Sequence, residues 1–599
     1  MRPNILWLTC EDIGPDLGCY GDGYADTPNL DALAERGVIY RNAWSEAPVC
    51  APARTDIITG VYSPCTGSEH MRSMLATPHC IGMYPQLLRE AGYYCTNNSK
   101  EDYNLEKPGQ VWDESSGEAH WRNREAGQPF FAIFNYTVTH ESRIRKRPHE
   151  LQHDPDLVDV PAYHPDTPEV RRDWAQYYDI ITAMDAQVGE ALAELAEAGL
   201  AEDTIVFFYG DHGSGMPGHK RDARNAGLLV PLIVAIPPKF RHLASADYVE
   251  GGATDRLVGF TDLGPTVLSL AGVQPPEVMQ GRAFMGRHEA PPRSYLHGFR
   301  GRMDERYDMV RCTRDQRYIY IRNFMPHLPR GQHVAYQLET PSTRAWKRLY
   351  EEGKLNAAQS AFWEPRPPEE LYDLQEGPDE VTNLADSEEH RDVLERLREA
   401  NRQWLLDIRD VGFLPEPEIH RRSEGSTPYE VGHDPQRYPL ERIMAAAERA
   451  SSLHDEAVPA LLEDLGREDC AVRYWAAMGL MMRGEEAVAA GRDELMALLD
   501  DESKAVRVAA AEALGCEGDE ADAAAALEVL VELADAEVQG PYVAMMALNA
   551  IDHMGQRAAP ALNRIRELPD RNSALDRRVQ YGIPNLLEKI ISDLEDAWK

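Results

Sequence analysis

The sequence predicts an α/β protein with a mostly parallel central sheet flanked by helices, then a small antiparallel sheet subdomain, then an all-α domain of helical repeats. In the first 293 residues short apolar runs alternate with amphipathic segments, which is typical of a parallel sheet covered on both faces. From residue 294 the runs become alternating in character, and after residue 440 the chain is rich in Ala, Leu and Glu.

The first region, residues 1–293, contains four nearly continuous apolar runs that we expect to form core strands. These runs are 4–10, 130–136, 204–209 and 229–235. Amphipathic segments lie between them, and we expect these to form the covering helices. These segments are 29–37, 84–92 and 172–199.

The second region, residues 294–414, is expected to form the small antiparallel sheet. Residues 318–323 alternate with strong β character, and 370–374 is a second strand candidate. A helix predicted over 390–409 would pack on this sheet. The following residues, 415–439, hold several Pro, Gly and charged residues, which favours a linker.

The third region, residues 440–599, contains an internal repeat. The sequence AVRYWAA at 471–477 returns in kind as AVRVAAA at 505–511, an offset of 34 residues, and a looser copy lies at 541–547. Helix-pair repeats at this spacing favour an α-solenoid of the HEAT type. A plain helical bundle is the alternative interpretation.

The composition excludes some function classes. The chain has 62 Lys and Arg against 100 Asp and Glu, a formal charge of −38, which argues against a nucleic-acid partner. No apolar run approaches the ~18 residues needed to cross a bilayer, so no membrane partner is expected. The apolar run at 5–8 is too short for a signal peptide, which predicts a cytoplasmic protein if the chain is complete. Nine cysteines without a C-x-x-C pair do not suggest a disulfide framework.

The sharpest local signal is the motif Cys50-x-Pro52-x-Arg54. A cysteine at the start of a helix, with proline in the first turn, lies where backbone N–H groups point outward and favour an anion. Arg54 adds a positive group able to bind an anion through two hydrogen bonds. On the motif alone, a buried structural cysteine beside a helix start is an equally good interpretation.

Acidic residues follow two of the predicted strands. Glu11 and Asp12 come directly after the first strand, and Asp211 and His212 follow the strand at 204–209. Because the carboxyl ends of parallel strands meet at one edge of a sheet, these side chains can converge there. Oxygen ligands favour Ca²⁺ or Mg²⁺, although a histidine leaves Mn²⁺ or Zn²⁺ open. Without the other motifs, the acidic pair at 11–12 would be interpreted as a solvated helix cap.

Taken together, the ordered motifs resemble the type I sulfatases of the alkaline-phosphatase-like superfamily. The matching segments are 3–6 with its acidic pair, 50–54 with Thr59-Gly60, 210–213, and 370–374 followed by 380–384. The resemblance covers about residues 1–410. Within this family, the segments 69–72 and 97–100 are similar to those of bacterial proteins related to heparan N-sulfatase.

The resemblance implies that Cys50 is not used as a thiol. A maturation enzyme would oxidise it to formylglycine, whose hydrate carries two hydroxyl groups. One hydroxyl, bound to a divalent cation, would attack sulfur and expel the alcohol or amine. Deprotonation of the second hydroxyl would then eliminate sulfate. The expected cation is Ca²⁺, with Mg²⁺ or Mn²⁺ as alternatives.

The resemblance also assigns roles to individual residues. The metal ligands would be Glu11, Asp12, Cys50, Asp211 and His212. Arg54 would orient the formylglycine hydrate. The residues that would grip the sulfate or protonate the leaving group are Lys100, His140 and Lys220.

Two positions depart from the family pattern. Many members have aspartate where this chain has Glu11, so the longer side chain could shift the metal or remove one ligand. Many also have histidine at the position of Asp102. The base that releases sulfate would therefore be Asp102 or His140.

Three further residues are candidates for substrate contact. His70 and Arg72 could bind a carboxylated or sulfated sugar, or could instead stabilise a loop. His219, beside Lys220, is a candidate on the leaving-group side.

These features predict a sulfatase acting on a sulfated sugar. A phosphonate monoester hydrolase or phosphodiesterase of the same superfamily is the first alternative. The second is an inactive sulfatase-like scaffold whose helical repeats bind a partner. For the repeats themselves we expect contact with a protein partner or self-association, because their acidic character disfavours a polyanionic glycan.

Overall fold

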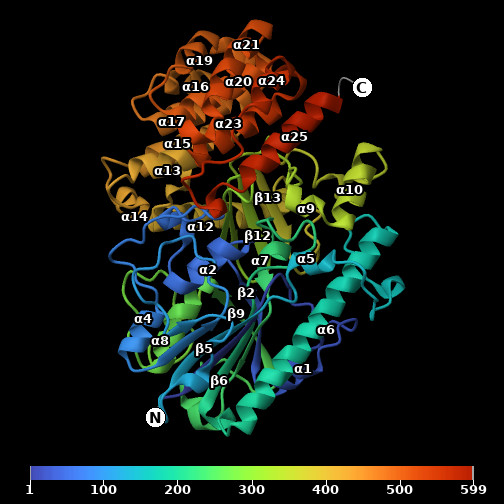
Figure 1. Cartoon of the computed structure of the whole chain (residues 1–599), viewed down its shortest axis with the longest axis vertical. Coiled ribbons are helices and arrows are strands. Elements are labelled where there is room, and N and C mark those ends of the chain that lie inside the picture. The colour runs from blue at the N-terminus through green and yellow to red at the C-terminus, as the bar shows by residue number, and fades with distance from the viewer. Residues whose placement is uncertain (1, 597–599) are drawn as a thin grey trace.

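The computed structural model describes residues 2–596 and arranges the chain in three layers along its long axis (Figure 1). An α/β core lies at one end, a small sheet lies in the middle, and a helical domain lies at the other end. Within the described residues, no helix combines the length and the apolar character that a membrane span requires.

The α/β core is built on one nine-stranded sheet. Its strand order is β4-β3-β5-β1-β6-β8-β2-β7, with β9 paired to β2. Every pairing is parallel except those that involve β7 and β8, which confirms the predicted mostly parallel sheet. The strands are β1 (Asn4–Cys10), β2 (Val38–Trp44), β3 (Tyr94–Asn98), β4 (Glu114–Ser115), β5 (Phe130–Tyr136), β6 (Thr204–Gly210), β7 (Leu229–Val230), β8 (Leu232–Ala235) and β9 (Gly252–Gly259).

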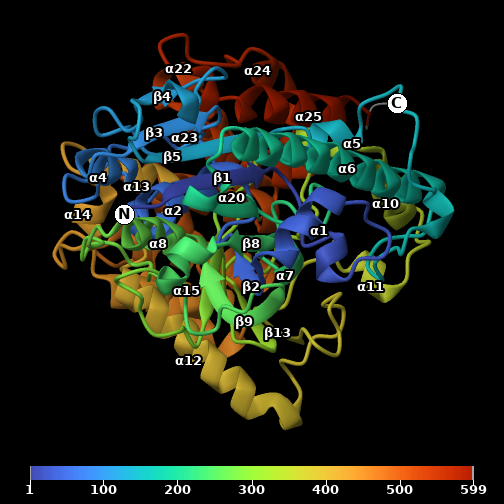
Figure 2. The ribbon, with the colours of Figure 1, turned by 90° about the horizontal axis from the view of Figure 1, so that it is seen from below.

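Helices cover both faces of this sheet, as Figure 2 shows from below. Successive residues of β1 explain why, because Ile5 and Trp7 enter one apolar cluster while Leu6 and Leu8 enter another. All four side chains are buried, so both faces need an apolar partner. One face is covered by α1 (Pro28–Glu35) and α6 (Pro168–Glu197), and the other by α2 (Cys50–Thr59), α4 (Pro85–Glu90) and α8 (Leu263–Ala271).

The small sheet is antiparallel, as expected, and has the order β10-β11-β12-β13. Its strands are β10 (Leu296–Arg300), β11 (Val310–Arg314), β12 (Tyr318–Asn323) and β13 (Glu369–Asp373). Helix α12 (Arg391–Ile408) packs against β11 and β12, close to the range predicted for it. The other helices in the first two layers are α3 (Ser63–Thr66), α5 (Glu141–Ile144), α7 (Asn225–Leu228), α9 (Ala335–Leu338), α10 (Pro341–Glu351) and α11 (Ala357–Ser360).

Residues 415–439, which we expected to be a linker, are instead packed into the structure. They form α13 (Glu416–Arg422) and α14 (Pro428–Gly432). The carboxylate of Glu416 is buried and accepts hydrogen bonds of 2.7 and 2.9 Å from the buried guanidinium of Arg302. Both partners of this ion pair are buried, and the pair holds the segment against the small sheet.

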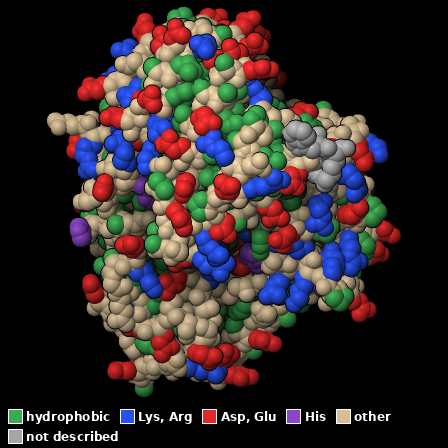
Figure 3. Space-filling view, turned by 45° about the horizontal axis from the view of Figure 1, so that its top comes forward, with side chains coloured by type: hydrophobic (Ala, Val, Ile, Leu, Met, Phe, Trp, Pro, Cys, Tyr) green, Lys and Arg blue, Asp and Glu red, His purple; other side chains and the backbone are tan. Residues whose placement is uncertain are grey.

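The helical domain follows as stacked helices from α15 to α25. Helices α15, α17, α20, α23 and α25 contact one another in that order, and the two closest sequence repeats lie within α17 and α20. Acidic side chains are frequent on its surface, although Lys and Arg interrupt them (Figure 3). The helices are α15 (Leu440–Ser451), α16 (Val458–Asp464), α17 (Cys470–Met481), α18 (Glu485–Ala490), α19 (Arg492–Leu498), α20 (Lys504–Glu517), α21 (Glu520–Leu533), α22 (Ala536–Gln539), α23 (Pro541–His553), α24 (Leu562–Arg566) and α25 (Gly582–Asp596).

The buried Arg311 of β11 joins the small sheet to the α/β core, and we expect its loss to destabilise the fold. Its guanidinium donates to Asp410 at 2.6 and 3.1 Å and to Glu69 at 2.6 Å. We expect Arg311→Met to lower the free energy of unfolding by about 3–5 kcal/mol, because two buried carboxylates lose their counter-charge. Urea denaturation measures this change. The matched Arg317→Met, at a side chain that is 41% exposed, should shift the midpoint far less; equal shifts would contradict the prediction.

Candidate active site

Four adjacent parallel strands bring the predicted polar residues to one edge of the sheet. The strands lie side by side in the order β3-β5-β1-β6 and share one direction, so their carboxyl ends coincide. The residues that follow these ends are Lys100 after β3, His140 and Glu141 after β5, Glu11 and Asp12 after β1, and Asp211 and His212 after β6.

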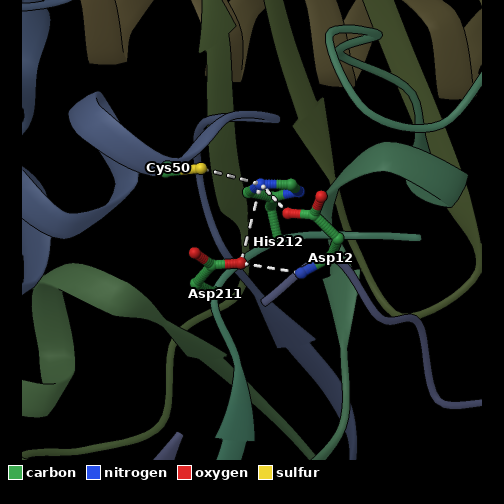
Figure 4. Close-up of side chains that lie close together, drawn as sticks. All are labelled: Asp12, Cys50, Asp211 and His212. Atoms are coloured by element: carbon green, nitrogen blue, oxygen red, sulfur yellow. Dashed lines mark hydrogen bonds and ion pairs between the residues drawn. The ribbon is translucent and has the colours of Figure 1, made fainter. Parts of the chain in front are cut away.

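Cys50 enters this group from α2, of which it is the first residue. The preceding Val49 is extended, so the helix begins at Cys50, and the contact with His212 places this helix N-terminus at the sheet edge. The side chain is only 3% exposed, and its Sγ lies 3.5 Å from Nε2 of His212 (Figure 4). The position predicted from the motif is thus inside the polar cluster.

Asp12, Cys50, Asp211 and His212 offer ligand atoms that all lie within 4.8 Å of one another (Figure 4). Oδ1 of Asp12 is buried without a hydrogen-bond partner, and it lies 3.1 Å from Nε2 of His212. The Nδ1 atom of His212 faces the carbonyl oxygen of Gly213 at 2.9 Å, which leaves Nε2 directed into the cluster. The two carboxylates and the imidazole are donors that can hold a divalent cation, and the two carboxylates are of the oxygen type that hard cations prefer.

The electrostatics of the cluster point the same way. Burial opposes protonation of His212, but the carboxylates of Asp211 and Asp12 nevertheless raise its pKa to about 10. The raised pKa reflects the negative charge of two buried carboxylates beside the imidazole, and this charge favours a bound cation. Asp12 also has a positive φ of 54°, a conformation that non-glycine residues adopt at a cost and that occurs often at functional sites.

Glu11 is placed next to this cluster rather than inside it. Its carboxylate accepts a hydrogen bond from Nζ of Lys100 and lies 3.9 Å from the guanidinium of Arg54. The group of four ligands described above does not contain it. Its role as a metal ligand therefore stays a prediction.

Arg54 holds the cluster from the side of α2. Its Nε and one terminal nitrogen donate to the same oxygen of Asp211 at 3.2 and 3.0 Å. The other terminal nitrogen donates to Asn135, near the end of β5, at 2.7 Å. Both contacts fix the orientation of the guanidinium beside Cys50.

Lys220 and His140 both lie close to Asp12. Nζ of Lys220 is 2.7 Å from Asp12 and 3.0 Å from Glu141. Nδ1 of His140 accepts a hydrogen bond from the backbone N–H of Ser142 at 3.3 Å, so the neutral ring carries its proton on Nε2. Burial first, and then the charge of Lys220, lowers the pKa of His140.

Sequence reasoning missed three charged residues that support this side. Glu141 accepts hydrogen bonds from Arg221 at 2.8 and 2.9 Å as well as the contact from Lys220, and Arg221 also binds Asp304. Glu141 and Arg221 directly follow the candidates His140 and Lys220, and this adjacency was an available signal. Asp304 comes from the loop between β10 and β11, and nothing in its local sequence marks it.

Two of the predicted substrate contacts lie elsewhere. His70 is 5% exposed, its Nδ1 accepts a hydrogen bond from the backbone N–H of Arg302 at 2.9 Å, and burial lowers its pKa to about 4. His219 is enclosed by aromatic rings, with Nε2 2.5 Å from the hydroxyl of Tyr163, and burial lowers its pKa to about 3. Both rings are buried, and the hydrogen bonds given above join neither of them to the cluster, so their contact with substrate stays a prediction.

Arg72 and Asp102 lie at the border between the cluster and the helical domain. Asp102 has an oxygen 3.9 Å from Nζ of Lys100. The guanidinium of Arg72 lies over the ring of Tyr581, 4.9 Å from its centre. These two candidates therefore contact the region that surrounds the cluster.

Ligands for a cation and positive side chains for an anion thus meet around one cysteine. This combination is that of a metal-dependent hydrolase of anionic esters.

Comparison with known proteins identifies the family. The family model described as Sulfatase matches residues 3–125 and 93–273. An ulvan-active sulfatase from Formosa agariphila is 39% identical over 486 residues, which cover 72% of this chain and 80% of that protein. N-sulphoglucosamine sulphohydrolase from Homo sapiens is 25% identical over 474 residues, covering 68% of this chain and 91% of that protein. The chain belongs to the sulfatase family.

A solved structure supports the fold. The phosphonate monoester hydrolase from Silicibacter pomeroyi superposes with a TM-score of 0.51 at 18% identity, covering 69% of this chain and 97% of that one. The predicted alkaline-phosphatase-like fold and the predicted sulfuric ester hydrolase activity are both confirmed.

Proposed function

We propose that this sulfatase removes sulfate from a sulfated carbohydrate, with residue 50 in its formylglycine form as the nucleophile and Ca²⁺ bound beside it. The observation that carries the proposal is the position of Cys50, at a helix N-terminus and 3.5 Å from His212 inside a cluster of candidate ligands. The hydrated aldehyde supplies a hydroxyl that attacks sulfur and a second hydroxyl whose loss of a proton releases sulfate.

The ligands assigned to the cation are Asp12, Asp211, His212 and residue 50. Oxygen donors favour Ca²⁺ and leave Mg²⁺ as an alternative, and the imidazole of His212 leaves Mn²⁺ as another. A bound cation would supply positive charge that activates a hydroxyl and polarises a sulfate oxygen. Glu11 remains a candidate ligand, although its carboxylate is paired with Lys100.

The side chains around the cluster orient residue 50 and compensate the charge of the sulfate group. Arg54, fixed by Asp211 and Asn135, holds the nucleophilic residue in one orientation. Lys100 and Lys220 approach from two sides and offset negative charge on the group in transfer.

His140 is placed to act first as an acid and then as a base. The proton on Nε2 can pass to the leaving oxygen or nitrogen, after which the same nitrogen can accept the proton whose loss releases sulfate. The competing base, Asp102, has one carboxylate oxygen engaged at 2.6 Å by Arg578. This engagement favours His140 for both steps.

The substrate class is supported by the relatives, one of which is active on ulvan and another on N-sulphoglucosamine. We expect the purified protein to release sulfate from at least one member of a panel of sulfated mono- and disaccharides that includes N-sulfoglucosamine and its 6-O-sulfated isomer. Sulfate in solution is measured by ion chromatography. The sugar, the sulfate position and the choice between O–S and N–S cleavage follow from which members react.

A phosphonate monoester hydrolase is the second candidate, and the fold shared with such an enzyme is the observation that favours it. Paired aryl esters separate the two. We expect kcat/KM for an aryl sulfate to exceed that for the matching aryl phosphonate monoester by about 10-fold or more. The reverse order would assign the phosphonate activity.

The 34-residue offset and the stacked helices support the proposal that the helical domain is built from HEAT-type repeats. Its acidic surface disfavours a polyanionic glycan, so we expect it to contact a protein partner or a second copy of the chain. The segment 571–581 of this domain differs, because it carries a net positive charge.

A further inference from the structure

One short segment of the helical domain reaches the active site. Residues 571–581 lead into α25, and in Figure 1 this red chain lies against the loops above the sheet. The segment carries three arginines against one aspartate, although the whole chain has a charge of −38. Its local charge therefore suits an anionic ligand, unlike the rest of the domain.

Tyr581 touches the residues that surround the nucleophile. Its hydroxyl lies 3.6 Å from the sulfur of Met71. Met71 in turn packs in one buried cluster with Val49 and Ala51, the two residues that flank Cys50. One side chain thus separates Tyr581 from the neighbours of the nucleophile.

Tyr581 also joins the network of charges that supports Lys220. Its hydroxyl donates to Oδ1 of Asp304 at 2.8 Å, and the other oxygen of Asp304 accepts from Arg221. Arg221 binds Glu141, which contacts Lys220. The helical domain is therefore linked to the site by a continuous path of hydrogen bonds and ion pairs.

Arg578 acts on a second part of the same border. It donates to one oxygen of Asp102 at 2.6 Å, while the other oxygen of Asp102 lies 3.9 Å from Nζ of Lys100. Arg578 therefore competes with Lys100 for this carboxylate, while Lys100 keeps its hydrogen bond to Glu11.

Arg72 has no carboxylate in direct contact with its guanidinium in the part of the chain that the structure describes. No ion pair joins its guanidinium to a carboxylate among residues 2–596, and its buried Nε has no hydrogen-bond partner. The ring of Tyr581 supports it at 4.9 Å. Burial opposes its charge, but the nearby Tyr581, Asp102 and Asp304 raise its pKa. An anion bound at this half-buried guanidinium would supply the hydrogen-bond partner that its Nε lacks.

The helical domain is fixed in this position by close contacts. Asn549 of α23 donates to the carbonyl oxygen of Glu305 at 2.9 Å, and Arg306 pairs with Asp552 at 2.8 Å. A Cβ atom on Gly582, the residue after Tyr581, would lie 3.0 Å from the side chain of Glu305. The segment therefore has little freedom to move away from the site.

We infer that the helical domain forms one wall of the substrate site, where Tyr581 positions Arg72 to bind a second anionic group of the substrate beside the sulfate that is removed. The inference rests on the proposed sulfatase activity and narrows its substrate. The favoured substrate is a carbohydrate with a further carboxylate or sulfate. A monoanionic aryl sulfate reaches the nucleophile without using Arg72.

Full-length variants test this inference on matched substrates. The substrates are 4-nitrophenyl sulfate and pairs of sulfated disaccharides that differ by one carboxylate, or by one additional sulfate. We expect Arg72→Gln and Tyr581→Ala to raise KM for the more anionic member of a pair by about 10-fold or more, since a charged hydrogen bond is lost. The readout is the ratio of the KM values of the two members of a pair, because any effect of a variant on Lys220 is shared by both members and by 4-nitrophenyl sulfate.

Two further variants make the result specific. Tyr581→Phe keeps the ring below Arg72 and should retain most of the preference, and the exposed neighbour Arg577→Ala removes a charge from the same segment and should have little effect. Equal changes on both members of every pair, or no change in either variant, would overturn the inference while sulfatase activity stands. Binding of the disaccharides to Cys50→Ala protein, measured by calorimetry, tests the contact without turnover, so failure of the proposed activity is seen separately.

Discussion

Replacement of Cys50 by alanine abolishes sulfate ester cleavage. We expect kcat to fall by at least about 10⁴-fold, because the bond-forming group is lost while the surrounding charges remain. The fold should survive, since alanine fills most of the space of a side chain that makes a single polar contact, with His212 at 3.5 Å. Initial rates on 4-nitrophenyl sulfate, with circular dichroism as the check on folding, measure both effects.

Cys65 provides the matched control for this prediction. It is also buried, at 1% exposure, but lies in α3 outside the cluster. Cys65→Ala should retain turnover within a few-fold of the parent. Similar losses in both variants would show that buried cysteines affect activity through stability alone, and comparable turnover by Cys50→Ala and the parent would refute the assigned nucleophile.

Removal of the cation has the second largest expected effect. Dialysis against a chelator should lower the rate roughly 10²-fold or more, because positive charge at the developing oxyanion is lost. The stripped protein should remain folded, since Lys220 and Arg54 already compensate Asp12 and Asp211 in the structure. Titration with Ca²⁺, Mg²⁺ and Mn²⁺ then ranks the metals by recovered rate, with Ca²⁺ expected first.

An internal control separates the metal from other effects of the chelator. Asp12→Asn should reduce both the bound metal, measured by elemental analysis, and the activity, and added Ca²⁺ should not restore either fully. Full activity in protein shown to be free of metal would rule out the assigned ligands.

The convergence of the site could be predicted because it depends on local sequence and on one topological rule. The runs at 4–10, 130–136 and 204–209 are strands in the structure, and parallel strands place Asp12, His140 and Asp211 at one edge. The helix start at Cys50 was also visible, since proline two residues later favours a first turn.

Other parts of the site depend on contacts between residues far apart in the chain. Arg578 meets Asp102 across 476 positions, and Tyr581 meets Asp304 across 277. No local pattern encodes such packing. For the same reason His70 could not be recognised as buried, because its enclosure comes from Arg302 and Tyr307, more than two hundred positions away.

The measurement that tests the account most directly is the mass of the peptide containing residue 50, taken from protein of measured specific activity. The account predicts that active preparations hold this peptide with an aldehyde in place of the thiol, and that activity rises in proportion to the converted fraction. Full activity in a preparation whose residue 50 is entirely unmodified cysteine would contradict it.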